Sequence, residues 1–492
     1  MGIMRTKSIE QSIQDTEESE FQLRKALGPL DLTIFGIGVI IGTGLFVLTG
    51  QAAANFAGPA VSLSFVVSGV ACALAALCYA EFASTVPVAG SAYTFSYASL
   101  GEFIAWIIGW DLILEFILGA SAVSVGWSGY FGQLLSSLFG ITLPTAITNE
   151  GVVNLPAAGI ALLLMAILVV GIRASSSFNV AITVIKLAVV FFFIGVGLFL
   201  VNTANWDPFI PSAGADIASA SKEKAAEPSL LQAITGAEQQ SFGFTGIITA
   251  GAIVFFAYIG FDVVATTSEE ARNPQRDLPI GILASLGICT VLYVVVSLIL
   301  TGMVPYTALG NDAPLATALS ERGLDWAASL ISIGVLAGLT SVIMILMLGQ
   351  SRVAFAMSRD NLLPHFFARI HQRFRTPYRI TILTGIVVAL LAAFVDLQQL
   401  AELVNIGTLF VFVLVSISVV VLRRTHPDLR RAFRTPLVPV VPILAVLICL
   451  YLMISLPLGT WGRFVSWMVI GLVIYFAYSM HKSRLAQEEH TE

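Results

Sequence analysis

The sequence predicts an all-α membrane protein in which twelve transmembrane helices form two five-helix repeats of opposite orientation, followed by two additional helices. Hydrophobic residues make up 57% of the 492 residues and charged residues only 11%, which is too apolar for a soluble protein of this length. Several runs approach or exceed the roughly 20 apolar residues that cross the hydrocarbon layer of a bilayer. Two apolar segments, one in each half, are also interrupted by glycine, a pattern typical of transporters with inverted repeats.

Hydropathy predicts the twelve spans in chain order. They lie at about 30–56, 60–84, 103–134, 155–172, 178–201, 246–269, 280–304, 326–356, 379–396, 400–422, 437–457 and 462–480. The predicted domains are an N-terminal segment 1–29, a first repeat 30–201, an extracellular loop 202–245, a second repeat 246–422, a loop 423–436, helices 11 and 12 at 437–480, and a tail 481–492.

The distribution of positive charge predicts the orientation. Of the 25 lysine and arginine residues, twenty lie in the alternate segments that include both termini, four lie in the opposite segments, and Lys186 lies within a span. Cytoplasmic loops carry the excess of lysine and arginine in membrane proteins. We therefore expect both termini in the cytoplasm and the protein in the plasma (inner) membrane.

Composition argues against several classes of function. The net charge of −5 gives no sign of nucleic-acid binding. All five histidines fall in predicted cytoplasmic segments or the tail, and no span carries a carboxylate cluster of metal-binding type, so we expect neither a metal nor another cofactor, and no enzyme. The four cysteines have no metal or disulfide spacing and are expected as small core residues. A channel would need a continuous polar lining, which spans this apolar do not offer.

The first span contains FGIGVIIGTGLFVLTG, from Phe35 to Gly50, with five glycines. Each glycine weakens a helix by roughly 1 kcal/mol relative to alanine. One interpretation is close helix packing, because Gly38 and Gly42 form a GxxxG pair. The other is a deliberate break near Gly42 and Gly44 that frees backbone groups at membrane depth. The stretch by itself leaves both interpretations open.

The sixth span offers a matching interruption, with a glycine and a carboxylate in the stretch Ala257–Asp262. A break in the first helix exposes carbonyls near Ile40 and amide N–H groups near Thr43 and Gly44. A break in the sixth exposes carbonyls near Phe256, Ala257 and Ile259. Free amides suit a carboxylate and converging carbonyls suit an ammonium, so the two breaks together predict a site for an α-amino acid.

Three stretches carry a resemblance to a known family: FGIGVIIGTGLFVLTG, YAEFASTVPVAGSAYTFSYASLGE and FFAYIGFDVVATTSEEARNPQRDLP. The sequence resembles the amino acid–polyamine–organocation (APC) superfamily, and within it the bacterial cationic amino acid transporter (CAT) family. The resemblance implies a leucine-transporter-like 5+5 inverted repeat with discontinuous helices 1 and 6. It also implies amino acid transport by alternating access, commonly coupled to protons. Substrate carboxylate would meet the amides of Thr43 and Gly44, and the ammonium would meet the carbonyls of Ile40, Phe256, Ala257 and Ile259.

Four ionisable residues lie deep in predicted spans, where each costs several kcal/mol unless paired or hydrated. Lys186 is interpreted as a proton-coupling amine, because burial favours the uncharged form; a snorkelling lysine or a partner for a buried carboxylate is the alternative. Glu115 is either a site carboxylate or a structural one. Asp262 is expected to cap the helix after the break, with substrate contact as its rival. Asp111 is expected to be structural.

The substrate is less well defined than the backbone site. Glu115 and the family resemblance favour L-amino acids with cationic side chains, such as arginine or lysine. Small neutral amino acids such as alanine are the alternative, since the space near Gly42 and Gly44 is tight, and an amino acid exchanger is another. The expected partners are the amino acid, a proton and the lipid bilayer. A monomer is compatible with the sequence, and a small membrane accessory subunit is left open.

Overall fold

The regular structure of the protein is helical throughout the part described. The computed structural model describes residues 27–85, 91–149, 151–171, 176–213, 227–236, 242–265, 267, 271–371, 374, 376–425, 427–428 and 431–484. Within these ranges, pairing of the β type is limited to two isolated bridges, Leu27 with Ala271 and Ser229 with Pro457. The all-α prediction is confirmed.

Eight helices in the described residues are long and apolar enough to cross a membrane, and four shorter apolar helices accompany them. They follow the order of the predicted spans. The first span comprises α2 (Pro29–Ile40), η1 (Gly44–Leu48), α3 (Thr49–Ala52) and η2 (Ala53–Ala57), and the sixth comprises α10 (Gly243–Val254), η8 (Phe255–Tyr258) and α11 (Phe261–Ala265). The others are α4 (Val61–Thr85), α6 (Glu102–Phe139), α7 (Leu155–Val170), α8 (Ser176–Leu198), α12 (Pro274–Met303), α14 (Asp325–Arg359), α15 (Tyr378–Phe394), α16 (Leu397–Thr425), α17 (Val440–Ile454) and α18 (Leu458–Ile474).

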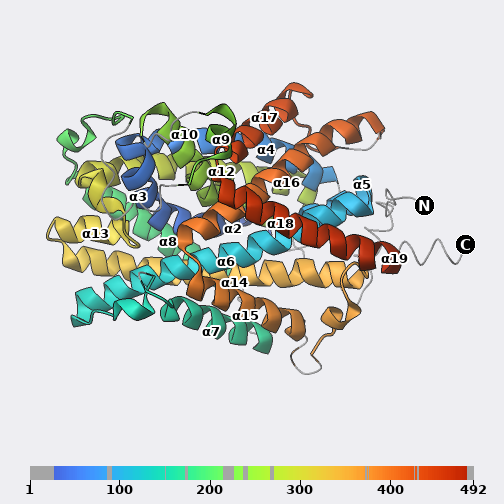
Figure 1. Ribbon diagram of the computed structural model, residues 1–492, viewed down its shortest axis with the longest axis horizontal. Coiled ribbons are helices and arrows are strands. Elements are labelled where there is room, and N and C mark those ends of the chain that lie inside the picture. The colour runs from blue at the N-terminus through green and yellow to red at the C-terminus, as the bar shows by residue number, and fades with distance from the viewer. Residues whose placement is uncertain are drawn as a thin grey trace, which may run out of the picture.

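Three short helices were not predicted from hydropathy: α5 (Ser91–Ser99), α9 (Leu230–Thr235) and α13 (Pro314–Glu321). Each is too short to register as a membrane span. In Figure 1, α5 lies at the end of the bundle that also holds α19 (Met480–Lys482), whereas α13 lies at the opposite end beside α3. The α5 end is the one that the positive charges predict to be cytoplasmic.

The two longest helices, α6 and α14, run along the length of the bundle (Figure 1). Small residues let them pack closely: a Cβ on Gly109 would lie 2.8 Å from the sulfur of Met357, and one on Gly349 would lie 3.7 Å from the ring of Phe116. With 38 residues, α6 is about 57 Å long, so it extends beyond a hydrocarbon layer of about 30 Å. Its middle carries Glu115 into the centre of the molecule.

The last two helices pack on the outside of the repeats. The rings of Trp110 on α6 and Trp467 on α18 stack with centroids 4.3 Å apart, and the indole N–H of Trp110 donates to the Trp467 carbonyl at 2.9 Å. In the core, all four cysteines are buried and unpaired, as expected. Helix α18 therefore packs on α6 and α16, whereas α17 packs mainly on α16 and α4 and touches α10 of the interrupted sixth span.

Both ends of the first span are tied to the second repeat. At one end the amide of Arg272 donates to the Leu27 carbonyl at 2.8 Å. At the other, the side-chain amide of Gln51 on α3 donates to the Asp312 carboxylate at 3.3 Å, and Asn149 donates to the same carboxylate at 3.2 Å. The interrupted first span is thus fastened on both sides of its break.

Candidate functional site

The first span is broken where the glycines predicted. Helix α2 ends at Ile40, and Ile41 is extended with φ −72° and ψ 101°. Helical hydrogen bonding resumes when the amides of Leu45 and Phe46 both donate to the Gly42 carbonyl at 3.1 Å. The first amides of a helix have no acceptor within that helix. The amides of Thr43 and Gly44 therefore lie at the start of a helix in the middle of the span, where the helix itself offers them no acceptor.

Packing explains part of the glycine content. A Cβ on Gly38 would lie 2.2 Å from the Thr183 hydroxyl of α8, and one on Gly36 would lie 2.6 Å from the Ser285 hydroxyl of α12. Contacts this short exclude any larger side chain. Helix α2, the half of the first span before the break, is therefore pressed against two helices, so close packing accounts for these two glycines.

The glycines at the break behave differently. A Cβ on Gly42 would meet the Val342 side chain at 3.8 Å and the Ile40 carbonyl at 4.0 Å, which are ordinary contact distances. A Cβ on Gly44 would lie 2.2 Å from the Cα of Ala257, which belongs to the sixth span. The absence of a side chain at Gly44 thus allows the two interrupted helices to meet backbone to backbone.

The sixth span is broken in three steps. A 3-10 turn, η8, follows α10; Ile259 is then extended with ψ 137°, and Gly260 has φ +114° before α11 begins. This left-handed conformation favours glycine. A Cβ on Gly260 would also lie 2.6 Å from the Val39 side chain of α2. The predicted pair of discontinuous helices is confirmed, and each break packs against the other span.

Tyr293 of α12 links the two breaks, and sequence reasoning missed it. Its hydroxyl lies 2.8 Å from the Ile40 carbonyl and 2.8 Å from the Ala257 carbonyl. A hydroxyl has a single hydrogen, so it cannot donate fully to both acceptors at once. These are two of the carbonyls predicted to receive the substrate ammonium. A tyrosine within an apolar run has no local signal for this position, which arises only from the packing of α12 on both interrupted helices.

Replacing Tyr293 by phenylalanine is expected to destabilise the substrate-free protein more than the substrate-bound protein. Leaving a buried acceptor unpaired costs about 1–3 kcal/mol, whereas a bound ammonium would supply new donors to Ile40 and Ala257. Saturating amino acid should therefore raise the melting temperature more in this variant than in the wild type. Tyr93→Phe is the control, since the Tyr93 hydroxyl donates to the Asp360 carboxylate at 2.7 Å, outside both interrupted spans. The same ligand response in Tyr293→Phe and wild type would contradict the assignment.

Lys186 is buried beside the inner half of the first span. Its side chain is 1% exposed, and its ammonium donates to the Gly38 carbonyl. Its stem passes over Gly338 of α14, where a Cβ would lie 2.9 Å from both Cγ and Cε of the lysine. Among the described residues Lys186 forms no ion pair. The amine of Lys186 is therefore held against the Gly38 carbonyl, two residues before α2 ends at Ile40.

The three carboxyl groups that the sequence places deep in spans are all buried. Asp111 and Glu115 are one turn apart on α6, and Asp262 lies in the first turn of α11. Glu115 is 2% exposed, interacts electrostatically with both aspartates, and lies beside the Thr408 hydroxyl. Its Oε1, and both oxygens of Asp111, have no hydrogen-bond partner in the described part of the chain. The Asp262 carboxylate lies beside the backbone amides of Asp262, Gly260 and Val263, at the start of α11.

The predicted site residues thus fall into three groups. Nine of the ten are buried and Ile259 is half-buried. The structure brings the two breaks into contact, sets Glu115 and Asp262 within electrostatic reach of each other, and holds Lys186 on the inner half of the first span. The residues of the breaks are Ile40, Gly42, Thr43, Gly44, Phe256, Ala257 and Ile259.

The sequence is similar to known transporters over most of its length. The chain is 48% identical over 495 residues to the branched-chain amino acid permease BcaP of Bacillus subtilis (strain 168), covering 99% of each chain. It is 47% identical over 469 residues to the methylthioribose transporter of the same organism, covering 94% of this chain and 95% of the relative. With the vacuolar cationic amino acid transporter 4 of Arabidopsis thaliana it shares 37% identity over 431 residues, covering 87% and 68%.

These similarities agree with the apolar helices in indicating a multi-pass membrane transporter rather than an enzyme. They confirm the predicted resemblance to the APC superfamily. The family described as amino acid permease matches residues 27–478, which is nearly the whole of the chain. The chain therefore belongs to the amino acid permease family.

Proposed function

We propose that the protein is a secondary active carrier that imports L-amino acids together with protons by alternating access. The observation that carries this proposal is the meeting of two broken helices, with carbonyls of Ile40 and Ala257 converging on one hydroxyl. An ammonium has three hydrogens for such acceptors, and the amides of Thr43 and Gly44 suit the carboxylate of the same molecule. The backbone site reads the α-carbon groups that all amino acids share.

The proposed coupling group is Lys186. A charged amine attracts the partially negative carbonyl end of α2 and holds that half-helix in place. Loss of the proton removes the attraction and frees the inner half of the first span to move. The Lys186 ammonium donates to the Gly38 carbonyl and so supplies the positive charge that a bound sodium ion would otherwise bring. We therefore propose a proton rather than sodium as the driving ion.

The substrate side chain is proposed to be neutral and aliphatic. Support comes from the 48% identity over 99% of both chains to a relative named for branched-chain amino acids. A buried carboxyl is compatible with a neutral substrate when it is protonated, because desolvation penalises the ionised form. We propose the orientation with both termini in the cytoplasm. In this orientation, a substrate that moves toward the α5 end of the bundle is imported.

A cationic substrate is the second candidate, and a specific observation favours it. Glu115 and Asp262 are buried near each other, and neither has an ion pair with a cation among the described residues. The side chain of arginine or lysine would supply that charge. Attraction at about 4 Å in a partly desolvated site contributes on the order of 1–4 kcal/mol.

Counterflow in proteoliposomes separates the two candidates. Vesicles loaded with unlabelled leucine should accumulate labelled leucine, and external isoleucine should compete whereas arginine should not. If leucine gives no counterflow and vesicles loaded with unlabelled arginine accumulate labelled arginine, the cationic candidate replaces the neutral one. No accumulation with any of the twenty amino acids would remove the carrier proposal itself.

Replacing Glu115 by glutamine gives a prediction for each candidate. For a neutral substrate, the loss of affinity should be the same for all accepted amino acids, because the glutamine changes only the surroundings. For a cationic substrate, arginine affinity should fall by about tenfold or more, since 1.4 kcal/mol corresponds to a factor of ten, while alanine affinity changes little. Competition against a labelled substrate in proteoliposomes measures both. Equal losses for arginine and alanine would assign Glu115 to structure or gating.

A further inference from the structure

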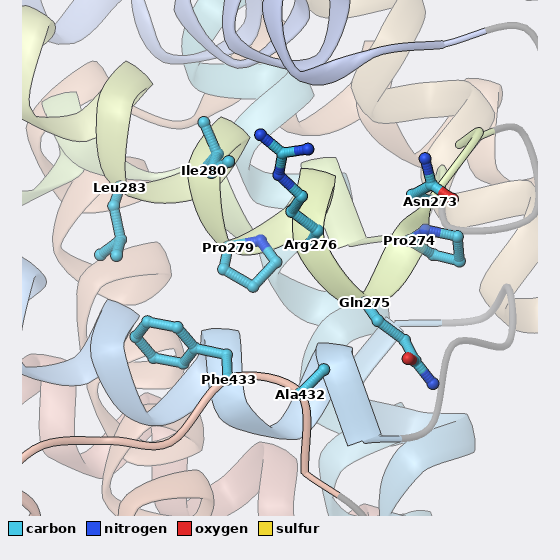
Figure 2. Close-up of a pocket in the computed structure, with 9 residues that line it drawn as sticks. All are labelled: Asn273, Pro274, Gln275, Arg276, Pro279, Ile280, Leu283, Ala432 and Phe433. Carbon is cyan, nitrogen blue, oxygen red and sulfur yellow. The ribbon is translucent and has the colours of Figure 1, made fainter.

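A cavity of about 780 Å³ opens between the first turns of α12 and the chain segment 431–435 (Figure 2). Phe433 and Ala432 lie across the cavity from Pro279 on α12 in this view. The cavity is separate from the two helix breaks, and its lining is drawn from segments that the arginine distribution predicts at the cytoplasmic boundary. Because this cavity is not the proposed amino acid site, we ask which other molecule its lining would bind.

The lining changes from polar to apolar along α12. Gln275 and Arg276 stand in the first turn, whereas Ile280 and Leu283 follow one to two turns further on. Eight residues of helix separate Gln275 from Leu283, or about 12 Å along the axis. Ile280 remains 40% exposed, and in Figure 2 the Phe433 ring lies on the side of α12 to which Pro279 and Leu283 point. This distance is comparable to the depth from phospholipid headgroups to the first part of the acyl chains.

The opposite wall is held in place by polar contacts with α4. Glu81 receives two hydrogen bonds from Arg423, at 2.9 and 2.7 Å, and one from the Thr435 amide at 2.7 Å. The Phe433 amide lies 3.4 Å from the Ser84 hydroxyl. Charge-assisted contacts of this kind fix the geometry of a segment. The segment that forms this wall is therefore fixed by hydrogen bonds, and the cavity has a defined shape.

The charge of the groove is positive. Arg276 is exposed at the rim, and none of the described residues that line the groove is acidic. The neighbouring carboxylate of Asp277 is 3% exposed and already accepts the backbone amide of Asn273 at 3.2 Å. Basic pockets between membrane helices bind the headgroups of anionic lipids. A groove with a cationic rim and an apolar interior matches a molecule with a phosphate and an acyl chain.

We propose that this groove binds one anionic glycerophospholipid, with its phosphate near Arg276 and an acyl chain along Ile280, Leu283 and Phe433. The lipid is held by charge at the rim and by apolar contact inside, so a zwitterionic lipid with the same chains binds more weakly. This inference is independent of the amino acid substrate and of the coupling ion. It assigns the groove to the surrounding membrane and not to transport chemistry.

The test places a reporter inside the groove of the full-length protein. Ala432 lines the groove and is exposed, and the four native cysteines are buried, so Ala432→Cys can be labelled selectively with bimane. The labelled protein is reconstituted in phosphatidylcholine vesicles that contain increasing amounts of either dibrominated phosphatidylglycerol or dibrominated phosphatidylcholine. Phosphatidylglycerol should quench at about fivefold lower mole fraction, the preference expected for one arginine near the membrane surface.

Two variants and one control decide the result. In the Ala432→Cys background, Arg276→Gln should abolish the preference for phosphatidylglycerol, and Ile280→Phe should fill the apolar part and reduce quenching by both lipids. Arg424→Gln, an exposed arginine outside the lining, should retain the preference. Equal quenching by the two lipids in the parent protein would overturn the proposal. It would equally be overturned if Arg276→Gln kept the preference, if Arg424→Gln lost it, or if 10 mM inorganic phosphate displaced phosphatidylglycerol.

Discussion

Replacing Gly44 by alanine is expected to reduce amino acid binding by more than 100-fold while the protein still inserts into the membrane. The added Cβ would lie 2.2 Å from the Cα of Ala257, where neither backbone can yield as a side chain would. Overpacking of a well-packed site costs about 3 kcal/mol at the upper end of its usual range, which corresponds to a factor above 100. The separation of the two breaks would move the carbonyl and amide groups away from the same substrate molecule. Binding is measured by the thermal shift of purified protein with each amino acid.

Gly287→Ala is the matched control for this change. A Cβ on Gly287 would meet nothing within 4 Å, so this variant should bind substrate as the wild type does. Both variants must elute as monodisperse protein, which separates a local effect at the site from a failure to fold. A well-folded Gly44→Ala variant with unchanged affinity would mean that the backbone groups near this glycine do not hold the substrate.

Replacing Lys186 by alanine is expected to abolish uptake driven by an inward proton gradient, even where some substrate binding remains. The change removes the donor to the Gly38 carbonyl and with it the contact that depends on the proton. Lys186→Arg should fail as well, because a guanidinium stays charged at any accessible pH. Uptake of labelled amino acid into proteoliposomes is measured with either a proton gradient or a sodium gradient. Wild-type uptake that follows sodium and ignores protons would defeat this mechanism.

A second variant tests the position of the amine without removing it. Gly338→Ala would place a Cβ 2.9 Å from the lysine stem, so the side chain must shift although its charge is retained. Proton-driven uptake should fall in this variant while counterflow of substrate persists. Unchanged proton-driven uptake in Gly338→Ala, together with loss in Lys186→Ala, would show that the charge matters and its placement does not.

The interrupted helices were predictable from sequence because glycine leaves a local mark. Gly42 and Gly44 stand within an apolar run, and Gly260 stands beside a carboxylate, so both breaks appear in the pattern of residue types. Hydropathy likewise marks each membrane span, since the bilayer requires a minimum apolar length. The backbone of the site could therefore be outlined before any contact between distant segments was known.

Contacts between helices leave no such mark. Tyr293 and Gly338 are ordinary residues of apolar spans, and their places depend on how α12 and α14 pack. The close packing at Gly38 and the backbone contact at Gly44 could not be distinguished in the sequence, since both are glycines in the same run. Short helices such as α13 escaped for a different reason, because eight residues carry too little hydropathy signal.

The hydroxyl of Tyr293 affects how the empty carrier reorients across the membrane after it has released its substrate. A carrier that imports against a gradient must turn back unloaded, whereas an obligatory exchanger must be prevented from doing so. The Tyr293 hydroxyl lies between the Ile40 and Ala257 carbonyls, so in an unloaded carrier it would take the place of the substrate ammonium when the two spans close. The single hydrogen of the hydroxyl can satisfy the two carbonyls only in part. The unloaded carrier can therefore adopt the closed conformation, but this conformation is less stable than the closed conformation with bound substrate. We therefore expect net uptake into vesicles that contain no amino acid, and expect Tyr293→Phe to slow this net uptake more than it slows exchange.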